Sequence, residues 1–133
     1  MSSEAGKLAE KQPSLRTIAM PADANPAGDI FGGWIMSQMD LAGAIHASYA
    51  VKGRLVTVAV KSMSFHLPVF VGDQVSCYCE TSRIGNTSIS IDIETWVRRR
   101  QSDVELLKVT EASYTYVSID EDRKPVAISR HHD

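Results

Sequence analysis

The stretch from Asn25 to Ala50, NPAGDIFGGWIMSQMDLAGAIHASYA, constrains the fold more than any other part of this 133-residue chain. It opens with turn-forming residues, and from about Gly33 to Val51 its spacing predicts the one long helix of the sequence. Apolar side chains point in almost every direction around this helix: Phe31, Trp34, Ile35, Met36, Met39, Leu41, Ile45, Tyr49 and Val51. A helix that is apolar nearly all round is expected to be buried nearly all round.

One stripe of the helix departs from this pattern and carries a single acid, Asp40. At helical spacing the stripe contains small and polar residues: Gly33, Ser37, Asp40, Ala44, Ala47 and Ser48. Small side chains let another backbone or a thin ligand come close, so the stripe fits either a helix packing seam or a ligand groove. A carboxylate in such surroundings is either a costly structural feature or the working group of a site.

The chain after Lys52-Gly53 reads as strand. Alternation and β-branched residues predict strands over about 56–65, 75–83, 88–98 and 106–119, and a short strand over 15–20 precedes the helix. The run 88–98 alternates most clearly, with Ile89, Ile91, Ile93 and Val97 on one face and Ser90, Asp92, Glu94 and Trp96 on the other.

Hairpin-length connections, including turns at 84–87 and 101–103, join these strands and favour one antiparallel sheet. One apolar helix and one sheet with a clear apolar face predict an α+β domain whose sheet curls around the helix. Because a single helix leaves the outer face of the sheet uncovered, and Trp96 is placed on that face, we expect the chain to self-associate.

Composition excludes several other classes of protein. The chain is 44% hydrophobic and 23% charged, which is typical of one globular domain. A net charge of −2 gives no general reason to expect nucleic-acid binding, and Arg98–Arg100 is the one local basic patch. With no apolar run near 20 residues we expect no membrane insertion, and the polar start predicts a cytoplasmic protein.

The two cysteines, Cys77 and Cys79, lie two apart in a predicted strand. They share a face there but are too far apart for an unstrained disulfide. Without further cysteines or a nearby histidine they are a weak metal site, so we expect two reduced, half-buried thiols and no metal.

Four sequence segments in this order carry a resemblance to a known family. They are MPADANPAGDIFGGWIMSQMDLAGA, VTVAVKSMSF, PVFVGD and RIGNTSISI. Together they closely resemble the YciA-type acyl-CoA thioester hydrolases of the hotdog-fold superfamily, over roughly residues 14–128. Residues 1–13 are then a flexible lead-in and residues 129–133 a polar tail.

The resemblance implies a hotdog fold, in which an antiparallel sheet of five or six strands wraps around one central helix. It implies hydrolysis of acyl-CoA to free fatty acid and CoA, without a metal or a bound cofactor. It also implies dimers with a continuous sheet, often assembled as a trimer of dimers, and active sites between two protomers.

Family residues match several positions of this chain. The catalytic aspartate matches Asp40, and the loop asparagine matches Asn25, which in family dimers faces Asp40 from the other subunit. Close relatives often carry Asn where this chain has Ala27, so a role for a second asparagine is absent here or is taken by Asn25. Asp40 can act as a general base for water, or attack the thioester directly to give an anhydride.

The remaining site residues are predicted from their chemistry. Gly32 and Gly33 at the helix start fit an oxyanion site made of N–H groups, although two glycines also suit a tight turn. Thr57 and Val58 fit backbone contacts to the pantetheine arm, although they also fit ordinary strand residues. The 83–88 turn fits an anchor for CoA phosphates, although it also fits a plain hairpin: Arg83, Gly85, Asn86, Thr87 and Ser88.

Two other functions compete with the hydrolase. A hotdog hydratase or dehydratase commonly pairs a histidine with an acid, but residues 21–33 contain no histidine. A non-catalytic acyl-CoA-binding module would keep the groove and the phosphate anchor, and would not need Asp40 or Asn25. Acyl-chain preference is not specified by the sequence.

Overall fold

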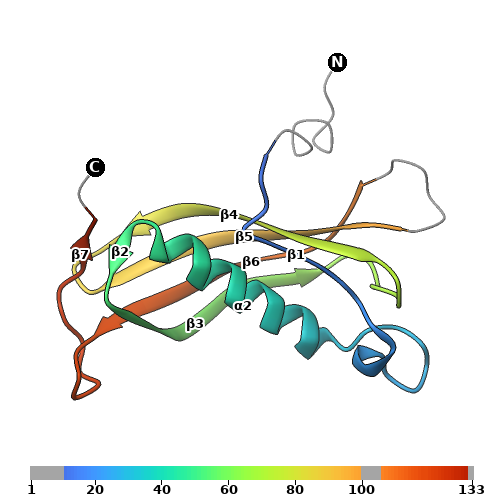
Figure 1. The fold of residues 1–133 in the computed structure, drawn as a ribbon, viewed down its shortest axis with the longest axis horizontal. Helices are drawn as coiled ribbons and strands as arrows, with labels where there is room; N and C mark the ends of the chain where they lie inside the picture. The colour runs from blue at the N-terminus through green and yellow to red at the C-terminus, as the bar shows by residue number, and fades with distance from the viewer. Residues whose placement is uncertain (1–10, 100–105, 132–133) are drawn as a thin grey trace.

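A computed structural model describes residues 11–99 and 106–131, and shows one long helix lying across one face of an antiparallel sheet (Figure 1). Helix α2 spans Gly32–Ser48. The sheet has the strand order β1-β4-β5-β6-β3, so β1 and β3 are its edges. The predicted α+β hotdog architecture is confirmed. The strands are β1 Leu15–Ile18, β3 Arg54–Phe65, β4 Gln74–Ile84, β5 Ser88–Arg98 and β6 Leu106–Ile119.

The core lies between the helix and the sheet. The alternating apolar residues of the strand at 88–98 face this core, as predicted. Ile89, Ile91, Ile93 and Val97 of β5 are all at most 1% exposed. The bounds of β5 and β6 match the prediction residue for residue, because alternation is strongest there. The turn predicted at 101–103 lies outside the described residues.

The prediction that the helix is buried nearly all round is wrong for the protomer. One face is buried against the sheet: Ile35, Met39, Ala42, Gly43 and Ala47. On the other side Leu41 is 54% exposed, Ile45 38% and Tyr49 79%. A single sheet can cover only one side of a cylinder, so the remaining apolar surface has no cover within the described chain.

The end of the helix and the C-terminal segment differ from the prediction. The helix ends at Ser48, three residues early, because the chain turns at Tyr49–Ala50 and Val51 enters strand β2 (Val51–Lys52). Strand β2 pairs with β7 (Ser129–Arg130), so part of the expected polar tail is ordered. Half-buried Ile128 packs on the core and brings this segment to β2.

The first strand is also two residues shorter than predicted. It ends at Ile18, because Met20 leads into the short 3₁₀ helix η1 (Pro21–Asp23), where proline opens the turn. Among the described residues, no helix is long and apolar enough to cross a membrane.

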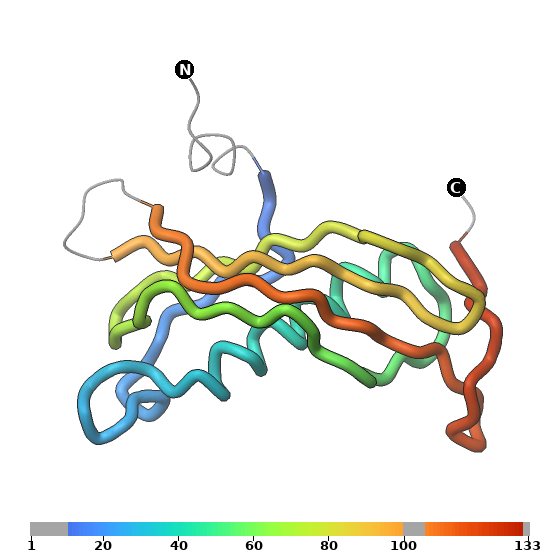
Figure 2. Tube along the Cα trace, turned by 180° about the vertical axis from the view of Figure 1, so that it is seen from behind, coloured from blue at the N-terminus to red at the C-terminus, as the bar shows by residue number. Residues whose placement is uncertain are grey.

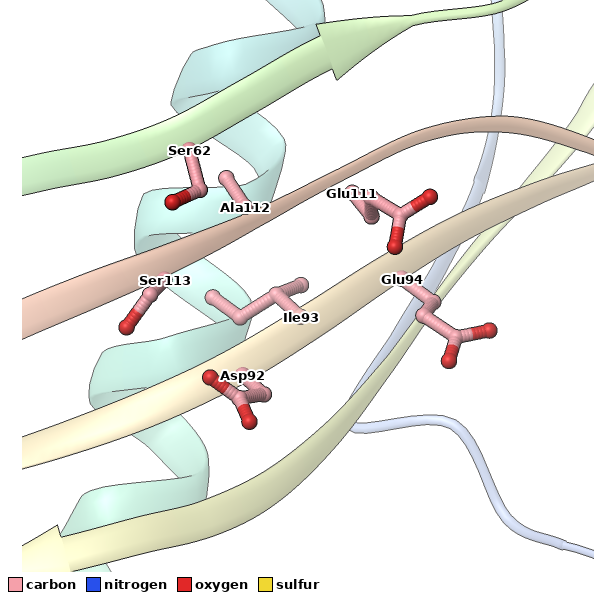
Figure 3. Close-up of a pocket in the computed structure, with 7 residues that line it drawn as sticks. All are labelled: Ser62, Asp92, Ile93, Glu94, Glu111, Ala112 and Ser113. Atoms are coloured by element: carbon pink, nitrogen blue, oxygen red, sulfur yellow. The ribbon is translucent and has the colours of Figure 1, made fainter.

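Figure 2 shows the molecule from behind, on the side of the outer face of the sheet, and this face carries one small apolar cluster. Trp96 does lie there, as predicted, but it is only 4% exposed because Tyr78 and Leu106 pack on it. The Trp96 indole N–H donates to Glu94 Oε1 at 3.0 Å, and Glu94 lines a hollow of about 290 Å³ that is open on the face away from the helix (Figure 3). It is lined by Ser62, Asp92, Ile93, Glu94, Glu111, Ala112 and Ser113. Trp96 is therefore not the exposed patch that would drive association.

Replacing Ile91 by Ala should destabilise the fold strongly. Ile91 is fully buried in the central strand β5, and truncation there removes apolar contacts and leaves a cavity. We expect a loss of about 2–5 kcal/mol in the free energy of unfolding, measured by urea titration, and about 0.5–1.5 kcal/mol for Ile91→Val. Equal losses for both variants would show that the site collapses without a cavity.

Candidate functional site

Asp40 lies midway along α2, half-buried, and is held by residues of two strands. The Thr57 hydroxyl donates a hydrogen bond to Asp40 Oδ1 at 2.6 Å. The Tyr116 hydroxyl donates to the Asp40 main-chain carbonyl at 2.8 Å. Thr57 and Tyr116 are cross-strand partners on β3 and β6. The carboxylate is thus fixed in place and still reachable from outside, as a reacting group must be.

The structure shows a contact of Thr57 that the sequence did not predict. Its side chain binds the acid, and the backbone contacts to pantetheine stay a prediction. A register shift between Thr57 and Ala59 leaves Val58 55% exposed on the edge strand. The alternation of residues 56–65 did not reveal this irregularity, nor that Thr57 lies opposite a tyrosine 59 positions later.

Asn25 lies in the loop before the helix and organises it. Its Oδ1 accepts a hydrogen bond from the Ala27 N–H at 2.9 Å, and its N–H donates to the Asp29 carbonyl at 2.7 Å. Gly28 has φ +104°, a conformation that glycine adopts without strain. The predicted turn is present, and Asn25 is half-buried within it.

Gly32 and Gly33 are the first two residues of α2, and both are exposed. Phe31, the preceding residue, makes no side-chain cap to their N–H groups. The first N–H groups of a helix have no intrahelical acceptor, so they are available to an oxygen atom of a ligand.

A groove of about 370 Å³ borders Gly32. Its walls come from the helix start and from the chain after β3, and most are apolar: Ile30, Ile35, Phe65, Leu67, Pro68 and Val69, with Asp29 and His66 as polar members. A groove of this character accepts an apolar chain.

In one chain the helix start and Asp40 do not meet. Gly32 and Asp40 are eight positions apart (40 − 32), which is about 12 Å along a helix axis. No point lies within direct hydrogen-bond reach, about 3 Å, of both groups.

The predicted phosphate anchor lies at the other end of the helix, beside β2 and β7 (Figure 1). It is a hairpin tied to the C-terminal segment: Ile128 N–H donates to the Asn86 carbonyl and Ser118 N–H to the Thr87 carbonyl, both at 2.8 Å. Gly85 N–H closes the turn on the Ser88 carbonyl at 2.8 Å. Arg83 and Asn86 are exposed there. In a single chain the predicted site residues therefore lie in three separate places. Asn25 and Gly32 belong to the loop and the helix start, Asp40 and Thr57 meet at the middle of the helix, and the 83–88 hairpin lies beyond its other end.

His46, His66 and Arg99 each contact a side chain elsewhere in the fold. His46 Nε2 lies 3.0 Å from the Thr81 hydroxyl, and His66 Nε2 lies 2.9 Å from Glu111 Oε2. Arg99 contacts Asp73 at 3.4 Å and stacks over Phe70, so this member of the basic patch supports the fold.

Both cysteines are free, Cys77 buried and Cys79 half-buried. Burial raises the pKa of Cys77 to about 12 and that of Cys79 to about 11, so both are protonated thiols at neutral pH. Within the described residues, no group of three or more His, Cys, Asp or Glu side chains could hold a metal ion.

Comparison with known proteins places this geometry in a family. The model of the thioesterase superfamily matches residues 27–102. The acyl-CoA thioester hydrolase YciA of Salmonella typhimurium is 55% identical over 113 residues, covering 84% of this chain and 85% of that protein. The YciA protein of Escherichia coli K12 is 53% identical over 116 residues, covering 86% and 88%.

This chain is also similar to solved structures of thioesterases. The hexameric thioesterase y2039 of Yersinia pestis superposes with a TM-score of 0.83 at 48% identity, covering 90% of this chain and 97% of that one. HI0827, a hexameric broad-specificity acyl-coenzyme A thioesterase, superposes with a TM-score of 0.87 at 45% identity, covering 99% and 90%. A variant of HI0827 with one aspartate replaced by alanine superposes with a TM-score of 0.85.

Proposed function

The chain belongs to the YciA acyl-CoA thioester hydrolases of the thioesterase superfamily, and from this premise we propose how its residues divide the reaction. The enzyme hydrolyses acyl-CoA thioesters, and Asp40 is the general base. The observation that carries this assignment is the 2.6 Å hydrogen bond from Thr57 to Asp40 Oδ1, which leaves the second carboxylate oxygen to bind water.

Each step follows from these positions. Asp40 removes a proton from water as the water oxygen adds to the thioester carbonyl carbon. N–H groups of Gly32 and Gly33 stabilise the oxyanion that forms. The intermediate then expels the CoA thiolate, which takes the proton, and the products are a fatty acid and CoA. Direct attack by Asp40 would instead give an anhydride that water cleaves in a second step.

Two chains are needed to assemble this site. The separation of about 12 Å between Gly32 and Asp40 in one helix means that a thioester bound to Gly32 meets the carboxylate of a second copy. Asn25 of the partner subunit then orients the water or the thioester oxygen, and the groove beside Gly32 receives the acyl chain. The 83–88 hairpin and the start of β3 hold the CoA moiety.

The protomer exposes two features that can form the interface between two copies: an edge strand and apolar side chains of the helix. Strand β3 is a free edge of the sheet, and Val58 and Val60 on it are 55% and 39% exposed. Helix α2 also exposes apolar side chains on its side away from the sheet, including Leu41. Pairing of two β3 edges would make a continuous sheet and cover the helices. Hexameric relatives support a trimer of such dimers.

Removing the carboxylate or its hydrogen-bond donor should lower turnover by different amounts. We expect Asp40→Asn to lower kcat by at least about 10²-fold and Thr57→Val by about tenfold, with little change in KM. Free CoA released from a panel of acyl-CoAs is the measurement. Thr57→Ser, which keeps the hydroxyl, is the matched control and should retain most activity. If Asp40→Asn releases CoA as fast as wild type, the chain binds acyl-CoA without this chemistry.

Mixing two inactive variants tests whether the site is shared. Asn25→Ala and Asp40→Ala protomers, mixed equally and allowed to exchange, should recover roughly a quarter of wild-type activity. Half of the randomly paired dimers are then mixed, and each has one intact site of two. No recovery, with exchange demonstrated by mass spectrometry, would place both residues in the site of one chain.

The exposed helix face should govern assembly. Leu41→Glu puts a charge on a residue that is 54% exposed in the protomer, so folding should be preserved while association is lost. We expect a lower mass by light scattering and a parallel loss of activity. Val126→Glu, at a position 41% exposed outside α2 and β3, is the control and should leave both unchanged. An unaltered mass for Leu41→Glu would exclude this face as the interface.

A further inference from the structure

Two tyrosines of β6 bind the main chain of the helix one turn apart. The Tyr114 hydroxyl donates to the Met36 carbonyl at 2.9 Å, and the Tyr116 hydroxyl donates to the Asp40 carbonyl at 2.8 Å. The spacing matches, because alternate strand residues are about 6.6 Å apart and a helical turn rises about 5.4 Å. The two rings stack with their centroids 6.5 Å apart.

The approach of Tyr116 depends on a missing side chain in the helix. A Cβ atom on Gly43 would lie 2.2 Å from the Tyr116 hydroxyl and 2.9 Å from Ile93 Cδ1, distances at which something must shift. Gly43 therefore lets the helix lie close to β5 and β6 three residues after Asp40. Glycine costs helix stability, so its presence in the middle of α2 indicates a packing requirement.

Asp40 is held twice, and Met36 only once. Tyr116 binds the Asp40 carbonyl, and its cross-strand partner Thr57 binds the Asp40 carboxylate. The tyrosine thus sets how deep the helix lies at the residue whose side chain must reach Thr57. Tyr114 makes the same kind of bond one turn away, at Met36, whose side chain is 36% exposed.

We propose that Tyr116, seated against Gly43, is a positioning residue for the reaction: its hydroxyl fixes the main chain at Asp40 so that the carboxylate meets Thr57 in one orientation. This inference rests on the proposed role of Asp40. Both tyrosines donate throughout the working pH range, since burial raises the pKa of Tyr114 to about 12, and burial and the nearby Asp40 carboxylate raise that of Tyr116.

The test compares Tyr116→Phe with Tyr114→Phe, two variants that each remove one hydroxyl from a helix carbonyl. A purely structural role predicts similar losses of thermal stability and similar effects on turnover. We expect similar losses of stability, but a drop in kcat of about three- to tenfold for Tyr116→Phe alone, with KM within about twofold of wild type. Equal changes in kcat for the two variants, or no change for Tyr116→Phe, would overturn the proposal.

A second comparison shows whether Tyr116 acts through the carboxylate. In a Thr57→Val background the carboxylate has already lost its donor, so Tyr116→Phe should lower kcat less than it does in wild type. Gly43→Ala should lower kcat more than Tyr116→Phe does. In a Tyr116→Phe background the further drop in kcat caused by Gly43→Ala should be smaller than in wild type, because Tyr116→Phe removes the atom closest to the new methyl group. Additive effects in the Thr57→Val background would contradict the proposal.

The two proposals fail in distinguishable ways. If Asp40→Asn keeps wild-type turnover, the role of Asp40 as base is wrong, and the positioning proposal falls with it. If Asp40→Asn is inactive while Tyr116→Phe and Tyr114→Phe behave alike, the general base stands and only the positioning role of Tyr116 is wrong.

Discussion

The close approach of α2 to the sheet is the constraint on which the rest of this structure depends. Gly43 has no side chain, and Tyr116 and Ile93 occupy the space that a methyl group would need. At this distance two buried hydroxyls find acceptors on the helix main chain, which satisfies polar groups that would otherwise be costly in the core. The same distance brings Asp40 within reach of Thr57 on the edge strand. Packing and the candidate chemistry therefore share one contact.

The helix presents apolar surface in two directions, and the protomer uses only one. Its buried side packs on β4, β5 and β6, while Leu41, Ile45 and Tyr49 are exposed. Exposed apolar side chains and an unpaired edge strand favour aggregation of a lone chain, and they can also form the interface of a specific assembly. The overprediction of helix burial has this physical basis: one sheet covers only one side of the helix, and the apolar residues on its other side stay exposed in the protomer.

Features that depend on residues close together in the sequence were predicted correctly. Strict alternation located β5 and β6 to the residue, and the solitary acid on a small-residue stripe identified Asp40 as a site candidate. Contacts that depend on register between distant strands were missed. Thr57 on β3 reaches the Asp40 carboxylate, and Tyr116, its cross-strand partner on β6, reaches the Asp40 carbonyl. The β2–β7 pair was missed because two-residue strands have no period to detect.

In the proposed assembly, association of two chains and the chemistry at Asp40 would be coupled through the exclusion of water. Asp40 is half-buried in the protomer, and the apolar surface around it faces outward, so an isolated chain leaves the carboxylate next to bulk solvent. A second copy that covers Leu41 and the β3 edge would exclude that solvent while adding the N–H groups of its own helix start. Electrostatic interactions strengthen as the local dielectric falls, so in the proposed assembly the base and the oxyanion donors would act more strongly than in a single chain. The proposed site, divided between two chains, would then be formed and desolvated in the same event.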